Sequence, residues 1–113
     1  MLIDLDYITI LPNELLRKGF SLREDIGVYE IAWRYSDIME VLNIVKDKKM
    51  VILGGDVYEL DNKIPFPTYD SWSFSEKNYK KSFDKAVEYI SNYHSANGDN
   101  FIYTIVVSKE ANE

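Results

Sequence analysis

The sequence predicts one α+β domain of two layers, in which two longer helices pack on one face of a mostly antiparallel or mixed sheet. The chain has 113 residues, of which 46% are apolar, enough to bury one core. Two segments repeat apolar residues at helical spacing, and runs rich in β-branched and aromatic residues lie around them. No repeat or linker divides the chain, so residues 1–113 are expected to form a single domain.

The first half of the chain predicts a helix, a strand and a second helix. Residues 11–19, "LPNELLRKG", combine an early Pro with a basic end and a terminal Gly, which is typical of a short helix. Residues 27–33, "GVYEIAW", alternate and predict an extended segment. Ser36 is a plausible N-cap for a helix over residues 37–48, whose apolar face comprises Ile38, Val41, Leu42 and Val45.

The second half predicts a strand, a long helix and a final strand. Residues 50–53, "MVIL", begin the first strand, and Ser75 is a plausible cap for a helix over residues 76–94. Residues 101–107, "FIYTIVV", form the strongest strand in the chain by β-branched and aromatic content. Because this strand is apolar on both faces, we expect it in the centre of the sheet. The apolar stripe of the long helix comprises Tyr79, Phe83, Ala86, Val87, Ile90 and Tyr93.

The stretch "MVILGGDVYEL", residues 50–60, places two glycines between two strand-like runs. A phosphate-binding loop needs a different spacing of glycines and a following helix, and neither is present. A Gly-Gly pair between strands is typical of a tight hairpin, because primed turns require positive φ. We therefore predict a structural turn at Gly54 and Gly55. The alternative is a bulge that lets a neighbouring backbone approach.

Composition and charge limit the classes of partner. The net charge of −6 argues against nucleic acid, since phosphate binding needs clustered Lys and Arg. No apolar run approaches the length of a membrane helix, and the first residues lack the features of a signal peptide. The absence of cysteine excludes thiolate chemistry and Cys-ligated zinc. We expect a cytoplasmic protein that binds neither nucleic acid nor membranes.

Acidic residues concentrate directly after the glycines. Residues 56–76 carry five acidic side chains and one lysine, a local charge of −4, whereas residues 77–113 are balanced. Tyr and Trp interleave with these charges, a composition typical of interface hot spots. Around Trp72, a packed loop that covers the sheet edge is an equal alternative. The residues predicted to bind a partner are Asp56, Tyr58, Glu59, Asp61, Tyr69, Asp70 and Trp72.

The glycine stretch "ILGGDVYEL" follows a helix of the "SDIMEVLNIVKDKK" kind and precedes "PTYDSW" and "KSFDKAVEYISNY". In these motifs, over about residues 14–94, the chain resembles the immunity protein 40 family of bacterial polymorphic-toxin systems. The resemblance implies a protein that binds and neutralises a cognate toxin domain and so protects the cell that makes it. It supplies no catalytic residues. The positions that match the motif are Gly54, Gly55, Asp56, Val57, Tyr58, Tyr69, Asp70 and Trp72.

Enzyme chemistry has little support in the sequence. His94 is the only histidine, and we interpret it as a surface residue that finishes the second long helix. Asp56, Glu59 and Asp61 lack the spacing of a calcium loop, so no metal, cofactor or catalytic residue is predicted. The leading hypothesis is a toxin inhibitor that blocks an active site with an acidic and aromatic surface. The alternatives are a small-ligand or carbohydrate-binding module using exposed Tyr and Trp, and a hydrolase using the acidic cluster.

Overall fold

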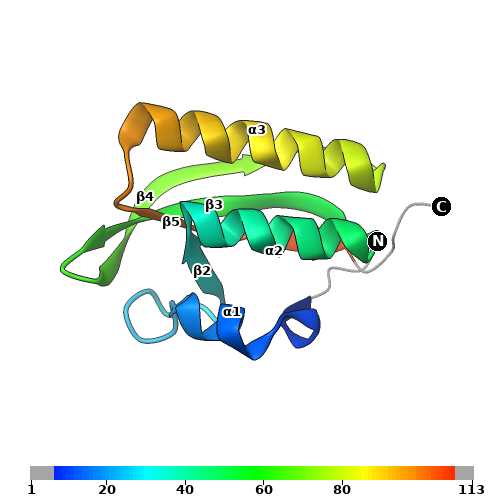
Figure 1. Ribbon diagram of the computed structural model, residues 1–113. Coiled ribbons are helices and arrows are strands. Elements are labelled where there is room, and N and C mark those ends of the chain that lie inside the picture. Colours follow the sequence, from blue (N-terminus) through cyan, green and yellow to red (C-terminus); the bar gives the residue numbers. More distant parts are fainter. Residues whose placement is uncertain (1–6, 109–113) are drawn as a thin grey trace.

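The computed structural model describes residues 7–108, which fold as a six-stranded antiparallel sheet with the two long helices on one face (Figure 1). This arrangement confirms the predicted α+β class. In chain order the elements are the 3-10 helix η1 (Tyr7–Ile10), α1 (Asn13–Lys18), β1 (Phe20–Ser21), β2 (Ile31–Arg34), α2 (Tyr35–Asp47), β3 (Val51–Asp61), β4 (Ile64–Ser73), α3 (Tyr79–Asn97), β5 (Phe101–Tyr103) and β6 (Val106–Ser108).

The strands run in the order β1-β2-β5-β3-β4, and β6 pairs with β3 beyond the end of β5. β5 and β6 are the two parts of the predicted final strand, and β5 lies inside the sheet as expected. Between them, Thr104 donates its N–H to the Asp56 carbonyl at 3.0 Å, and its hydroxyl accepts the Asp56 N–H at 3.0 Å. The threonine side chain therefore replaces a main-chain acceptor where the ladder is interrupted. β3 is paired on both sides, and β4 forms an edge.

The main core lies between the sheet and the helices. The predicted apolar face of α2 is buried there, and Trp33 on β2 is fully buried. The Trp33 indole N–H donates to the Leu15 carbonyl at 2.9 Å, which attaches α1 to the sheet. A second, smaller core on the opposite face packs Tyr58 and Ile102 against Leu22. The sheet is therefore covered on both faces at its β2–β5 side.

The helix boundaries differ slightly from the prediction. α3 begins at Tyr79, because the Asn78 side chain, and not that of Ser75, caps it by accepting the Lys81 N–H at 3.0 Å. α2 begins at Tyr35, directly after β2, so Ser36 lies within the first turn and is not the N-cap.

The buried face of α3 includes a serine that the apolar pattern could not reveal. Ser82 is fully buried, and its hydroxyl accepts the Ile52 N–H at 3.0 Å and donates to the Tyr79 carbonyl at 2.9 Å. Of the predicted stripe, Ala86 and Ile90 are buried, and the other members are half-buried. A polar residue thus joins α3 to β3 at the centre of the helix–sheet contact.

The predicted turn at Gly54 and Gly55 is wrong. Both glycines lie inside β3, and neither has a positive φ. The hairpin turns instead at Asn62 and Lys63, whose φ values are 52° and 67°. Two consecutive residues with positive φ are the geometry of a primed turn, and Asn tolerates that conformation better than most side chains. The turn therefore follows β3, the strand that contains both glycines.

The two glycines allow the neighbouring strands to approach β3 closely. A Cβ atom at Gly54 would lie 2.2 Å from the Trp72 carbonyl oxygen on β4. At Gly55 it would lie 2.1 Å from the Thr104 carbonyl oxygen, on the other side of β3. No side chain fits at such distances, so the alternative interpretation, a close approach of backbones, is confirmed.

We expect Gly55→Ala to lower the free energy of unfolding by at least about 2 kcal/mol, because the added carbon meets a backbone oxygen that cannot move aside cheaply. Urea denaturation measures the loss. Glu59→Ala, at an exposed position of the same strand, is the control and should stay within about 0.5 kcal/mol of the wild type. Equal midpoints for the two variants would contradict the close approach.

Candidate functional site

The seven residues predicted to bind a partner divide into exposed and buried groups. The buried group is Tyr58 and Trp72, and Trp72 exposes only 8% of its surface. These two rings are therefore mostly covered by packing within the protein. The exposed group comprises Glu59, Asp61, Tyr69 and Asp70, with Asp56 half-buried.

Two apolar side chains outside the predicted set are exposed on β4. Ile64 and Phe66 expose 45% and 49% of their surfaces, and they pair across the hairpin with Asp61 and Glu59. The hairpin end projects past the C-terminal end of α3, so α3 does not cover these residues (Figure 1). A signal was present, because large apolar residues occupy alternate positions in residues 64–67, "IPFP". The two prolines that follow them made this segment resemble a loop and not a strand. Acidic and apolar side chains therefore lie together on this projection.

β4 bulges at Thr68, Tyr69 and Asp70. Asp56 faces Ser71 and Tyr58 faces Pro67, so three residues of β4 lie opposite Val57 alone. Thr68 holds the bulge, since its hydroxyl donates to the Val57 carbonyl at 2.7 Å and accepts the Asp70 N–H at 3.0 Å. The bulge places Tyr69 at its apex.

Tyr69 combines a strained backbone with an exposed ring. Its φ is 67°, in the left-handed region, and 90% of its surface is exposed. For a bulky residue this conformation costs on the order of 1–3 kcal/mol. Within residues 7–108 its ring makes no aromatic, hydrogen-bond or ionic contact that would offset the cost. Folding alone gives no reason for an aromatic residue at this position.

Asp70, next to Tyr69, is fixed from α3. The Tyr93 hydroxyl donates to Asp70 Oδ2 at 2.8 Å. Burial and then the hydrogen bond to the Asp70 carboxylate raise the pKa of Tyr93 to about 12. This bond sets the direction of the carboxylate beside the exposed ring.

Stacked aromatic rings hold β4 against α3. The Trp72 and Tyr89 rings stack with centroids 5.4 Å apart, and the Tyr89 and Tyr93 rings with centroids 6.1 Å apart. The Trp72 indole nitrogen and the Tyr103 hydroxyl are buried without a hydrogen-bond partner, and burial raises the pKa of Tyr103 to about 12. The bulge is therefore built on a rigid aromatic support.

Asp56 lies apart from the hairpin acids and beside Glu30. Burial and then the Asp56 charge raise the pKa of Glu30, and burial followed by the same two carboxylates raises the pKa of Tyr58. The predicted acidic patch is thus two separate groups. Within residues 7–108 no three His, Cys, Asp or Glu side chains gather in a way that could hold a metal ion.

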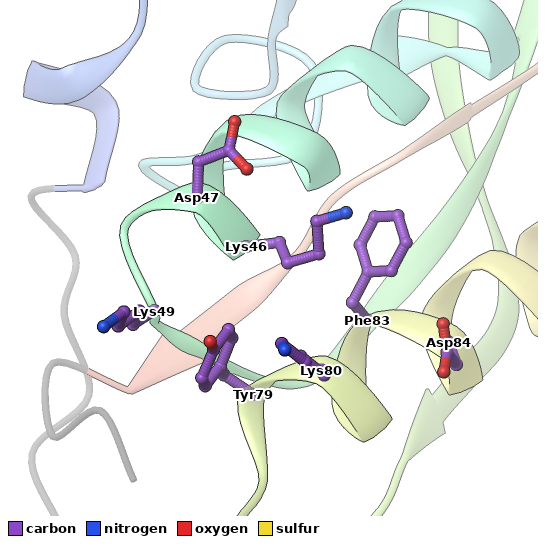
Figure 2. Close-up of a pocket in the computed structure, with 7 residues that line it drawn as sticks. All are labelled: Lys46, Asp47, Lys49, Tyr79, Lys80, Phe83 and Asp84. Carbon is purple, nitrogen blue, oxygen red and sulfur yellow. The ribbon is translucent and has the colours of Figure 1, made fainter. Parts of the chain in front are cut away.

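A pocket of about 350 Å³ lies elsewhere, between the end of α2 and the start of α3 (Figure 2). Its three lysines would suit an anion, but they do not converge. The Lys46 ammonium lies over the Phe83 ring at 4.3 Å, and the Lys49 side chain points in the opposite direction (Figure 2). The lining residues are Lys46, Asp47, Lys49, Tyr79, Lys80, Phe83 and Asp84, none of which belongs to the glycine motif.

His94 is half-buried near the end of α3. Its ring stacks on Tyr35, with centroids 3.9 Å apart, and its Nε2 contacts the Asp99 carboxylate. The Gly98 N–H donates to the His94 carbonyl at 2.8 Å, where the helix ends. These contacts agree with the predicted place of His94 at the helix end, but its ring is half-buried under Tyr35 and is not the surface side chain that we expected.

The raised pKa of Tyr93, caused by burial first and by the bond to Asp70 second, predicts a pH-dependent contribution to stability. The ordinary tyrosine pKa of 10.0 rises to about 12 on folding, so the folded state holds the proton more tightly. The contribution is therefore complete below pH 10 and is lost as the pH rises towards about 12. Asp70→Asn removes the charge, so Tyr93 should titrate at lower pH than in the wild type. NMR of the tyrosine ring carbons measures this, with Asp61→Asn as the control; identical Tyr93 curves in all three proteins would contradict the bond.

The family model of immunity protein 40 matches residues 21–107. Comparisons with curated proteins and with solved structures returned no significant match. The matched range includes both long helices, the glycines of β3 and the bulge of β4. None of the helices in the described part of the chain is long and apolar enough to cross a membrane. Since the match spans most of the chain, from the end of β1 into β6, the protein belongs to the immunity protein 40 family.

Proposed function

We propose that this protein neutralises a cognate toxin domain by occluding the toxin's active site with the exposed part of the β3–β4 hairpin. The single observation that carries the proposal is Tyr69, an exposed ring on a strained backbone. The residues of this surface, called the hairpin surface below, are Glu59, Asp61, Ile64, Phe66, Tyr69 and Asp70.

Backbone strain at Tyr69 supports a binding role. Strain that packing does not explain is concentrated at functional sites, and aromatic side chains dominate the energy of protein interfaces. Thr68 and the Tyr93–Asp70 bond fix both sides of this residue before any partner arrives. A surface ordered in advance loses less conformational entropy on binding. The bulge therefore presents its aromatic residue ready for contact.

The charge of the hairpin surface suits a basic partner. Glu59 and Asp61 pair across the hairpin with Phe66 and Ile64, Asp70 is exposed in the bulge, and no lysine other than Lys63 lies in residues 56–76. Acid at the rim attracts a basic cleft, and apolar and aromatic groups at the centre hold it. A toxin that acts on an anionic substrate has such a cleft, and its occlusion requires no catalytic residue, cofactor or metal in the inhibitor. We place this encounter in the cytoplasm.

A carbohydrate-binding function has less support. Trp33 and Trp72 are buried, so neither ring is available to stack on a sugar. Tyr29 is exposed, but it lines a hollow of only about 200 Å³, and the Arg23 guanidinium lies 5.1 Å from the centre of its ring. Tyr69 is therefore the one exposed tyrosine or tryptophan on β4, so a sugar would find no second such ring on this strand to stack on.

Co-expression tests the proposed function. The probe is a candidate toxin domain, taken from a reading frame next to the gene for this chain. We expect co-expression to restore growth of cells that the toxin domain arrests, and the two chains to co-purify. Arrest that persists at full expression of this chain, with no complex formed, would refute the proposal.

Tyr69→Asn separates binding from folding. Asn tolerates the left-handed conformation, so the free energy of unfolding should stay the same or rise by up to about 1 kcal/mol. Loss of the ring should weaken toxin binding at least about tenfold, mainly through faster dissociation. Surface-binding kinetics measure this. Tyr29→Asn removes another exposed tyrosine, with 81% exposure, and should bind as the wild type does; equal affinities for both variants would remove Tyr69 from the interface.

Charge reversal tests the acidic rim. Glu59→Lys and Asp61→Lys should each slow association with the toxin domain, and the difference should shrink as salt rises through the screening range. Asp84→Lys makes the same change in net charge on the first half of α3, at the far end from the hairpin (Figure 1). Stopped-flow association rates compare the three. A control that slows association as much as the rim variants do would show that only the total charge matters.

A further inference from the structure

The outer edge of β4 has no strand partner among residues 7–108, and part of it carries free main-chain groups. In an antiparallel pair, successive residues turn their N–H and C=O groups alternately towards the partner and away from it. The Phe74 N–H donates to the Leu53 carbonyl on β3 at 3.1 Å, so Phe74 faces inward. The main-chain groups of Trp72, two residues earlier, also point towards β3. Ser71 and Ser73, which are both exposed, therefore turn their main-chain groups outward.

The pairing on the far side of β3 agrees with this direction. Asp56 is opposite Ser71, and both main-chain groups of Asp56 bond to Thr104, away from β4. No main-chain group of Asp56 is left for Ser71. The main-chain groups of Ser71 consequently face away from the sheet.

Two prolines close the hairpin half of the same edge. The Leu60 N–H donates to the Asn100 carbonyl at 2.8 Å, towards β5. The main chain of its pairing partner Pro65 therefore points away from β3. Pro67, two residues further, faces the same way. Proline has no N–H to donate, and prolines at outward positions prevent an edge from pairing with another strand. The edge is therefore blocked at its start and open at Ser71 and Ser73.

A hollow lies on each face of the sheet beside the open edge, and both hollows include Ser71, Trp72 and Ser73. The hollow between β4 and α3, about 570 Å³, is lined by the rings of Trp72, Phe74 and Tyr89, with the polar side chains of Lys85, Glu88 and Asn92 on α3. The other, about 360 Å³, has Gly54 and Gly55 as its floor, with Asp56 at its side. Alternate side chains of a strand point to opposite faces, so a strand added here would direct one side chain to each hollow.

We propose that an extended segment of the toxin domain adds to the sheet as a further strand along Ser71 and Ser73. This inference rests on the proposed function and names how the partner is held. The aromatic hollow fits an apolar or aromatic side chain, and the glycine-floored hollow beside Asp56 fits a basic one. The glycines of the family motif then act twice, by bringing the strands together and by leaving space for a partner.

Charge favours this occupant over a second copy of the chain. Residues 56–76 carry a local charge of −4, and Asp70 is exposed beside the open edge. Two such edges pairing with each other would bring like charges together, whereas a basic segment meets the opposite charge. The partner is therefore an extended segment with at least one basic residue.

Proline substitution tests the strand addition. Ser71→Pro and Ser73→Pro each remove one outward N–H, and β4 already holds two prolines that face the same way, so pairing with β3 is kept. Each should weaken binding to the toxin domain identified by growth rescue at least about tenfold. Ser71→Ala and Ser73→Ala, which lose only the hydroxyl, should stay within about twofold of the wild type.

Amide hydrogen exchange on the wild-type protein gives a second measurement that does not depend on any variant folding. The Ser71 and Ser73 amides should exchange quickly in the free protein and become protected in the complex, while the Trp72 and Phe74 amides are protected in both. A bound toxin domain that leaves both serine amides exchanging, together with full affinity of the proline variants, would overturn the strand addition and leave the proposed function standing. A toxin domain that wild type does not bind would refute the proposed function itself. A dimer of the free protein that the proline variants abolish would assign this edge to a second copy and overturn the inference.

Discussion

The close approach of β4 and of Thr104 to β3 is the constraint on which the rest of the structure depends. It exists because two consecutive residues of β3, Gly54 and Gly55, have no Cβ atom to hold the neighbouring backbones apart. Trp72, opposite Gly55, is thereby drawn over the sheet and stacks on Tyr89 of α3. The position of the long helix, the support of the bulge and the hollow beside β4 all follow from this contact. A short sequence motif thus fixes relations among three elements.

The exposed side of β4 differs in kind from its buried side. Its inward groups are paired or packed, while its outward part carries a strained tyrosine, exposed apolar residues and acids. Much of this ordering is achieved by polar side chains, because Thr68 bonds within the bulge and Tyr93 reaches Asp70 from α3. These hydrogen bonds hold the bulge in one conformation without burying its side chains in an apolar core. That combination gives a surface that is rigid and still has unused contact area.

The sequence was a good guide where periodicity determines the structure. The apolar stripes of both long helices and the final strand correspond to real elements, because a buried face forces a regular spacing on the residues that form it. It was a poor guide to Gly54 and Gly55, since a pair of glycines suits a turn and a close approach equally well. Asn62 carried the better turn signal. The burial of Tyr58 and Trp72 was also out of reach, because the sheet is covered by packing on both faces where these rings lie, and alternation alone does not tell which positions are covered. Ile64 and Phe66 were left out of the predicted set because Pro65 and Pro67 made a real edge strand resemble a loop.

The placement of Pro65 and Pro67 has a consequence for the behaviour of the protein in a crowded cell. They lie beside Ile64 and Phe66, the exposed apolar residues that would make this edge most prone to aggregation. A protein that binds another chain exposes its binding surface before the partner is present, and this surface can then contact other copies of the same protein. Pro65 and Pro67 remove main-chain donors beside the exposed apolar residues, and the free main-chain groups lie at Ser71 and Ser73. The exposed apolar side chains and the groups that could pair with another strand therefore lie on different parts of β4. The ten residues of β4 therefore combine exposed apolar side chains with prolines that remove main-chain donors beside them.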